Sequence, residues 1–534
     1  MATAPKPAAG PAGEGERAPS AGRGTPGFAE QLVLDSGRIS APEVNRDALS
    51  LAMRGEFQLR FQAMRDLRLQ APITDPGADT LGQTHFLMQW LRLTPTLQYR
   101  DKLKIVGQID MPRGMVLGDT TRYVGAARDP RDALDWYQIH PRYLYLEYTS
   151  PIGLFRLGQQ GSHWGMGLVA NDGDHPALFG DYQRGSLVER LLFATRPFGE
   201  GHPLVAALGG DLVFEDNRAR LTNGDRALQA VAALRWAAPR FELGLYGVYR
   251  DQERERSSSG ALNEFTEELA VGVLDLAGGF NAPVPGADAF VFGQFEGAFI
   301  AGSTDFVRSI DQSASGMDER IRSYGGALGL GGVRTAGTGA DRWGDVVVAL
   351  EWGFASGDAD PSDGTSRRFT FDPNHNVGLV LFDHVLAWKT ARAATILQDP
   401  QLVRRPPPGL DLLPSEGGVF GATYLYPTLV VRPRRWLDLK AAAVIAQSTA
   451  DLVDPFHYGA LGNYANYEGG DERRHDLGLE LDLGADGRIA FDKGLTIQAG
   501  AEGGLLLPGH AFDDAAGNAL PPQYLLNVKL GMQF

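Results

Sequence analysis

The chain closes with Tyr524-Leu-Leu-Asn-Val-Lys-Leu-Gly-Met-Gln-Phe534, a stretch whose side chains alternate in character. One side of an extended strand would carry the apolar residues Leu526, Val528, Leu530, Met532 and Phe534. The other side would carry Asn527, Lys529, Gly531 and Gln533. A period of two predicts a β-strand with one buried and one polar face. Soluble half-buried strands share this pattern, so the rest of the chain must decide its surroundings.

The same alternation recurs from Leu51 onward and predicts about eighteen strands, with sixteen or twenty if one weak hairpin is merged or split. After the first strand, the expected strands cover 84–99, 103–111, 143–149, 154–160, 187–196, 203–215, 226–237, 241–251, 264–277, 288–302, 321–334, 343–356, 416–431, 436–448, 473–484, 493–508 and 522–534.

Short and long connections alternate along this series. Turns such as Arg100-Asp101-Lys102 are tight, whereas the connections 112–141, 161–186, 357–415 and 449–472 are long. An even number of strands places both chain ends on the side of the short turns, as in bacterial barrels with short periplasmic turns and long extracellular loops. The pattern predicts an all-β fold, a single closed antiparallel transmembrane β-barrel over 46–534. Residues 1–45 are rich in Ala, Gly and Pro and are predicted to form a disordered tail.

Two segments carry a family resemblance. The terminal strand with its final Phe534 resembles that of bacterial outer-membrane β-barrels, which implies that Phe534 belongs to the signal read by the barrel-assembly machinery. Phe155-Arg-Leu-Gly-Gln-Gln160, followed by Gly161-Ser-His-Trp-Gly165-Met-Gly167, resembles a motif of alginate-export-like 18-stranded porins. Gln159 stands where that family commonly has Arg, so the resemblance implies the architecture and a channel role but no anionic sugar polymer. It also implies the bacterial outer membrane, with lipid and lipopolysaccharide as surroundings.

The amino-acid composition agrees with an outer-membrane barrel. The formal net charge of −15 argues against nucleic acid as a partner, because no basic face dominates. The absence of cysteine fits an oxidising compartment. No run approaches the roughly 20 apolar residues of a membrane helix. The start, Met-Ala-Thr-Ala-Pro, lacks the apolar core of a signal peptide, so Met1 is expected to begin a mature or trimmed chain, or to be an incorrectly chosen start.

Aromatic residues near the expected strand ends suggest the girdles that flank the lipid-facing band of a barrel. They are Trp90, Tyr99, Tyr148, Trp236, Tyr249, Trp352 and Trp436. Ordinary aromatics at the edge of a soluble core are the alternative.

A barrel of about eighteen strands leaves an aqueous lumen unless a loop fills it. The inward-facing charges therefore bear on function. The lumen-lining candidates are Arg54, Glu56, Arg60, Arg92, Lys104 and Asp110 from the first strands and Asp476, Glu480, Asp482, Glu502 and Lys529 from the last. Closure makes the two groups neighbours, and opposed basic and acidic arcs would orient charged solutes. The alternative is that the charges pair into salt-bridged ladders that stiffen the wall.

The longest connection, 357–415, is expected either to fold inward and narrow the pore or to form a surface lid. Its segment starting at Leu386-Ala-Trp-Lys-Thr-Ala is expected to form a short helix. The leading functional hypothesis is a passive channel or exporter for small or polymeric hydrophilic solutes that needs no cofactor and no covalent chemistry. The solute, the direction of transport and the oligomeric state remain open.

Other sites are weaker. Acidic clusters in two loops are candidates for weak Ca²⁺ binding or simply solvated turns: Asp172, Asp174, Asp358, Asp360 and Asp363. The histidines show no metal-binding spacing. A barrel enzyme of phospholipase or protease type is a second hypothesis, for which the nearby groups are Ser162, Asp174, His140, His163 and His175. A plugged structural or adhesive barrel is a third.

Overall fold

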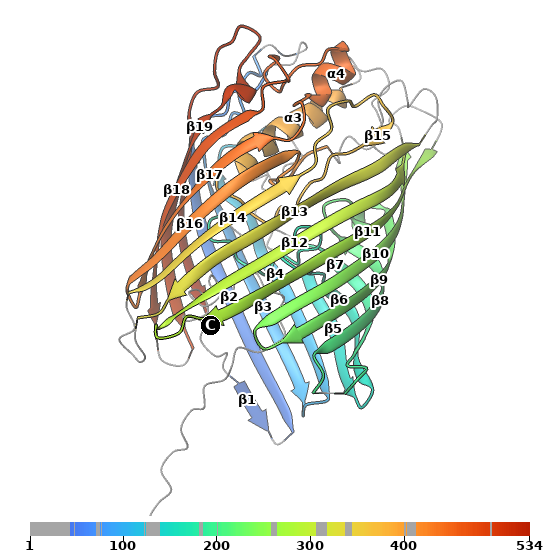
Figure 1. Cartoon of the computed structure of the whole chain (residues 1–534), viewed down its shortest axis with the longest axis vertical. Helices are drawn as coiled ribbons and strands as arrows, with labels where there is room; N and C mark the ends of the chain where they lie inside the picture. The colour runs from blue at the N-terminus through green and yellow to red at the C-terminus, as the bar shows by residue number, and fades with distance from the viewer. Residues whose placement is uncertain are drawn as a thin grey trace, which may run out of the picture.

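The computed structural model describes residues 43–46, 48–70, 75, 77–121, 123, 139–180, 185–199, 201–257, 264–305, 318–336, 344–399, 402, 413–491 and 494–534. These residues form one closed antiparallel barrel (Figure 1). The predicted fold class is confirmed.

Eighteen strands make up the wall in the described part of the chain. They are β2 Leu49–Met64, β3 His85–Tyr99, β4 Leu103–Gly118, β5 His140–Ser150, β6 Gly153–Gly161, β7 Leu187–Thr195, β8 Leu204–Glu215, β9 Asp225–Ala238, β10 Phe241–Ser257, β11 Glu264–Pro283, β12 Ala289–Thr304, β13 Glu319–Arg334, β14 Asp345–Ala355, β16 Ala422–Arg434, β17 Leu437–Ser448, β18 Asp476–Ala490, β19 Thr496–Pro508 and β20 Gln523–Gln533. Two short strands add to the wall: β1 Glu43–Arg46 pairs with β2, and β15 Thr365–Ser366 lies parallel to β13.

The barrel closes between its first and last long strands. Phe61 of β2 pairs with Val528 of β20, and Arg60 pairs with Lys529. Closure pairs the strand edges that an open sheet would leave exposed, which is required of a sheet in lipid. The chain end lies at the same end of the barrel as the short turns, and the long connections gather at the other end (Figure 1).

The outer face of the wall is apolar from strand to strand. One row of paired residues joins Leu328, Trp352, Leu425 and Ile445 across β13, β14, β16 and β17, and each is at least 40% exposed. Another joins Leu234, Leu245 and Leu276 across β9 to β11. A continuous exposed apolar surface of this extent does not suit water, whereas it matches the outward band of a transmembrane barrel.

Six of the seven aromatic residues expected in the girdles are exposed on the described wall: Tyr99, Tyr148, Trp236, Tyr249, Trp352 and Trp436. Trp90 differs. The guanidinium carbon of Arg92 lies 4.6 Å from the centroid of its ring, on the inner face of β3. Trp90 therefore faces the interior, because residues two apart on a strand share a face.

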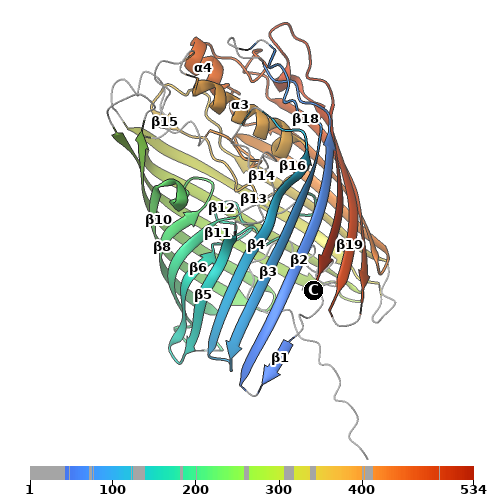
Figure 2. The same cartoon turned by 180° about the vertical axis from the view of Figure 1, so that it is seen from behind.

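The helices lie among the long connections. A π-helical turn, η2 Leu381–Leu386, runs into α3 Ala387–Leu397, and α4 Pro455–Leu461 lies near the rim. Two single 3₁₀ turns are η1 Leu221–Asn223 and η4 His510–Phe512. Figure 2 shows α3 within the end of the barrel that carries the long connections. None of the described helices has the length and hydropathy needed to span a membrane.

Some boundaries differ from expectation. β4 continues to Gly118, although the long connection after it was expected to start at residue 112. Residues 122 and 124–138 of that connection lie outside the described residues, as do residues 1–42 of the expected tail. β1 begins at Glu43, inside the range 1–45 that was assigned to the tail.

Replacing Phe534 with Ala should destabilise the closing seam. The Phe534 backbone exchanges hydrogen bonds of 2.7 and 3.0 Å with Gly55, and the Phe534 ring covers the space where a Gly55 side chain would lie. Loss of such a cross-strand contact should cost about 0.5–1 kcal/mol. We expect a lower urea midpoint and a lower yield of heat-modifiable barrel than for the neighbouring control Gln533→Ala. Equal midpoints for the two variants would contradict this role of the ring.

Candidate functional site

The connection between β6 and β7 crosses the inside of the barrel. Trp164 Nε1 donates a hydrogen bond of 3.1 Å to Asp275 of β11. The backbone N–H groups of Met166 and Leu168 both donate to the carboxylate of Glu296 on β12. β11 and β12 lie five and six strands along the wall from β6, so the segment leaves its own strands and reaches a distant part of the wall.

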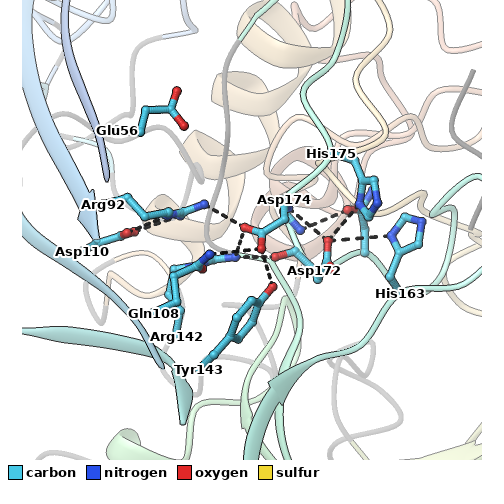
Figure 3. Close-up of polar contacts among 12 residues, drawn as sticks. Glu56, Arg92, Gln108, Asp110, Arg142, Tyr143, His163, Asp172, Asp174 and His175 are labelled. Carbon is cyan, nitrogen blue, oxygen red and sulfur yellow. Dashed lines mark hydrogen bonds and ion pairs between the residues drawn. The ribbon is translucent and has the colours of Figure 1, made fainter. Parts of the chain in front are cut away.

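The same segment returns to the wall at Asp174 (Figure 3). One carboxylate oxygen accepts hydrogen bonds from Arg92 at 2.7 Å and from Arg142 at 3.0 Å. The other accepts from the Tyr143 hydroxyl at 2.7 Å and from Gln108 at 3.3 Å. These four partners come from β3, β4 and β5, so a single carboxylate ties the segment to three strands.

A third attachment lies farther along, where the segment meets β17, β19 and β20. The N–H of Gly180 donates to Glu502 at 3.0 Å. Lys440 donates to the carbonyl of Leu178 at 2.7 Å and to Glu502 at 3.0 Å. Lys529 donates to the carbonyl of Gly180 and to Glu502. Segment 162–180 is thus attached to the inner face of the wall at three separate places.

A second segment enters the lumen from the connection between β14 and β16. The backbone N–H groups of Leu379, Val380 and Leu381 donate to the carboxylate of Glu480 on β18, at 2.5, 2.7 and 2.7 Å. Three consecutive N–H groups at the start of η2 have no helical partners of their own, so an inward carboxylate satisfies them.

The helix that follows is buried with its charges paired. Arg392 of α3 donates to Asp454 at 3.0 Å and to the carbonyl of Gln70 at 2.8 Å. Lys389 forms an ion pair with Glu468. Both cations are 1% exposed, and fully buried charges of this kind persist only when they are paired.

The two inward segments touch each other. The Asp372 N–H donates to the carbonyl of Leu168 at 2.8 Å, and Asn376 donates to the carbonyl of Phe179 at 2.8 Å. His375 lies 3.2 Å from the carbonyl of Met166 and 3.0 Å from Glu351 of β14. Segments 162–180 and 369–397, here called the inner segments, therefore form one layer inside the barrel.

Ionisation in the inner segments is shaped mainly by burial. Burial raises the pKa of Asp372 to about 7, assisted by the nearby carboxylates of Asp216 and Glu416. Burial also lowers the pKa of His163 to about 4, assisted by the neighbouring His175. In both cases the low-polarity surroundings favour the neutral form.

The lumen-lining candidates fall into three groups. Those buried in the wall are Arg60, Arg92, Asp110, Glu480, Asp482 and Glu502. Glu56, Lys104 and Lys529 are half-buried, while Arg54 and Asp476 are exposed. Arg92 pairs with Asp110, and Lys529 pairs with Glu502. Such pairing favours salt-bridged ladders over unpaired arcs at these four positions.

Asp476 does not follow the expected alternation. The pairing of β17 with β18 shifts its register between Ala446 and Gln447, which pair with Gly478 and Asp476. Leu477, expected on the lipid face, is 1% exposed and belongs to the interior cluster. A bulge of this kind reverses which face a side chain occupies.

The sequence reasoning missed several residues that anchor the inner segments, among them Asp275, Glu296, Arg142, Tyr143 and Lys440. A usable signal existed for two of them. Asp275 and Glu296 are isolated acids within otherwise apolar or glycine-rich strands, Val271-Gly-Val-Leu-Asp275-Leu and Phe292-Gly-Gln-Phe-Glu296-Gly. An isolated carboxylate in such a strand indicates a specific inward partner.

Four of the five loop carboxylates considered for Ca²⁺, all except Asp172, have other partners. Asp174 forms ion pairs with the guanidinium groups of Arg92 and Arg142, and their positive charge disfavours the binding of a metal cation there. Asp358, Asp360 and Asp363 accept hydrogen bonds from N–H groups of their own turn, and Asp363 also pairs with Arg367. These contacts are those of ordinary Asx turns, and Ca²⁺ binding at these loops stays a prediction.

Of the groups considered for a barrel enzyme, Ser162, Asp174 and His175 do not form a serine-based set in the described part of the chain. The Ser162 hydroxyl accepts a hydrogen bond from Arg190 at 3.1 Å. Asp174 is occupied by Arg92 and Arg142, and His175 lies 3.0 Å from Asp172. A nucleophile–base–acid chain requires contacts in sequence, and in the described part of the chain Ser162, Asp174 and His175 contact other groups instead.

Replacing Asp174 with Asn should loosen segment 162–180. Arg92 and Arg142 would stay positively charged but would lose the negative charge of Asp174. For a largely buried ion pair, this loss reduces the free energy of unfolding by up to about 3 kcal/mol. We expect faster hydrogen exchange at the N–H groups of Met166, Leu168 and Gly180. Asp363→Asn, at an exposed ion pair, serves as the control and should change nothing there. Unchanged exchange in Asp174→Asn would show that Asp174 does not hold the segment.

Comparison with known proteins gives similarity in structure only. No protein-family model and no curated protein matches the sequence. Acinetobacter baumannii OccAB1 is 10% identical with a TM-score of 0.46, covering 93% of this chain and 99% of that chain. The outer membrane protein OprD of Pseudomonas aeruginosa is 10% identical with a TM-score of 0.45, covering 90% and 93%. OccK5 of P. aeruginosa is 9% identical with a TM-score of 0.43, covering 90% and 98%. These likenesses concern the backbone alone.

Proposed function

We propose that this chain is an outer-membrane channel that gives hydrophilic solutes passive passage and catalyses no reaction. One observation carries the proposal: an eighteen-strand barrel with an apolar outer face encloses a layer of loops anchored to polar groups of its wall. A wall of this many strands is too wide for its own side chains to fill. Loops pinned at several places narrow such a lumen and give it a defined shape.

The narrowing is assigned to both inner segments. The connection 357–415 supplies η2 and α3, and the connection 161–186 supplies the segment between Trp164 and Gly180. Their backbone N–H groups meet the carboxylates of Glu296, Glu480 and Glu502, so the attachments are polar and directional. Selectivity would then follow from inward charges outside these attachments, such as Arg54 and Lys104, for which the described part of the chain shows no ion pair.

The apolar outer face of the barrel also supports a proposal for what surrounds the protein. We assign the apolar belt to contact with outer-membrane lipid and lipopolysaccharide, and β20 with Phe534 to recognition by the barrel-assembly machinery. Both assignments rest on the exposed apolar rows and on the resemblance of the terminal strand.

Solute flux into proteoliposomes tests the proposal. Vesicles containing the refolded protein should swell in isotonic solutions of small sugars, and the rate should fall as the sugar becomes larger. A plugged structural barrel is the second candidate, favoured by the complete burial of η2 and most of α3. Absence of swelling with correctly folded protein would support the plugged barrel and refute the channel.

A further inference from the structure

Three potential metal ligands meet within segment 162–180 (Figure 3). They are His163, Asp172 and His175, and one ligand atom of each lies within 4.8 Å of the others. His163 precedes the crossing to β12, whereas Asp172 and His175 follow the return. The fold thus brings His163 next to Asp172 and His175, a combination that the sequence did not indicate.

The geometry is close to that of a ligand set. Nδ1 of His175 lies 3.0 Å from Oδ1 of Asp172, and Nδ1 of His163 lies 3.9 Å from the same oxygen. The two imidazole rings stack with centroids 3.9 Å apart. Bonds of about 2.0–2.1 Å to a tetrahedral zinc ion place ligand atoms about 3.4 Å apart. The ligand atoms here lie within 4.8 Å of one another, so binding requires a closure of up to about 1.4 Å and a separation of the two stacked rings.

His163 provides an independent indication of a ligand. Its side chain is 9% exposed, and neither ring nitrogen makes a hydrogen bond of normal geometry among the described residues; its polar neighbours there are the Gly165 backbone and the Asn171 side chain. A buried polar group without a partner is costly, and each such case in a folded protein calls for an explanation.

Asp172 is held in position by its neighbours. Its side chain accepts a hydrogen bond of 3.0 Å from the N–H of Asp174, and its carbonyl accepts one of 2.6 Å from Arg142. Such supporting contacts orient a ligand before a metal arrives. Asp174 itself points to Arg92 and Arg142, which leaves one carboxylate and two imidazoles for the ion.

We propose that His163, Asp172 and His175 bind a divalent cation of the zinc class, with a fourth position open to water or solute. Two nitrogens and one carboxylate suit zinc and its neighbours among the transition metals. Calcium prefers six or more oxygens and does not suit this set. The bound ion would clamp the start of the segment to its return, and this inference does not depend on whether the barrel conducts.

Zinc binding to the full-length protein, refolded in detergent and freed of metal, tests the proposal. In competition with a chromogenic chelator we expect one equivalent of Zn²⁺ to bind, and millimolar Ca²⁺ not to displace it. His163→Ala, His175→Ala and Asp172→Asn should each weaken binding at least about tenfold, since even the loss of a supporting group around a metal has this effect. His510→Ala, at a histidine whose side chain is 69% exposed, is the matched control and should bind as the unchanged protein does.

Cobalt gives a second readout, because Co²⁺ bound at a four-coordinate site absorbs visible light strongly. The spectrum should appear with the parent protein and vanish in His163→Gln, a variant chosen in case His163→Ala does not fold. Heat-modifiable migration verifies the barrel in each variant. Absence of a stoichiometric site, displacement by Ca²⁺, or undiminished binding in the folded variants would each overturn the proposal.

Discussion

Removing residues 372–418 and joining Phe371 to Val419 through an Asn-Gly turn should raise the single-channel conductance several-fold. The structure suits this deletion because the Phe371 N–H donates to the Val419 carbonyl at 2.8 Å and Thr370 pairs with Phe420. The two ends are therefore already placed as the arms of a hairpin, and Asn-Gly is a favoured two-residue turn. The deletion takes η2 and α3 out of the barrel while leaving its eighteen strands in place.

The increase is expected because the wall alone encloses a wide lumen. Shortening the exposed turn at 515–517, which lies outside the inner layer, is the matched control and should leave the conductance unchanged. An unchanged conductance in the 372–418 deletion, with a barrel that still migrates as folded, would show that this segment does not narrow the pore.

Replacing Glu480 with Ala should release the same segment without shortening the chain. The carboxylate accepts three backbone N–H groups, and each buried donor left without a partner costs about 1–3 kcal/mol. We expect the N–H groups of Leu379 to Leu381 to exchange far faster and the channel current to become unsteady. Glu480→Gln keeps one oxygen acceptor and should give an intermediate result.

Asp482 offers a matched comparison on the same strand and face. It is 0% exposed, as Glu480 is, but among the described residues its carboxyl contacts the Glu480 carboxyl and accepts none of the three N–H groups. Asp482→Asn should therefore leave exchange at 379–381 unchanged or slow it slightly. If Glu480→Ala and Asp482→Asn behaved alike, the three hydrogen bonds would not be what holds the segment.

The strand pattern was predictable because the barrel wall imposes a local rule. Each strand has one face toward lipid and one toward the interior, so apolar and polar residues alternate along it. The turns are marked by Pro, Gly and charged residues, as at Arg100-Asp101-Lys102. The rule fails where the backbone departs from regular pairing. The register shift next to Leu477 turns this apolar side chain inward, and the alternation in the sequence does not predict the shift.

The inner layer was only partly predictable. The length of 357–415 suggested a constriction, and Leu386-Ala-Trp-Lys suggested the helix that the structure shows from Ala387. Segment 161–186 gave no comparable signal, because its attachments join residues far apart in sequence: Asp174 to Arg92 and Gly180 to Glu502. The cluster of His163, Asp172 and His175 was not predicted from the sequence for a related reason. A loop that crosses the barrel and returns places side chains together without a regular spacing.

Single-channel recording of the refolded, full-length protein in a planar bilayer tests the account most directly. We predict steady, long-lived conductance steps in symmetric salt, and a reversal potential in a salt gradient whose sign identifies the inward charges that govern selectivity. A heat-modifiable barrel that inserts into the bilayer and passes no current would contradict the channel and leave a barrel closed by its inner segments.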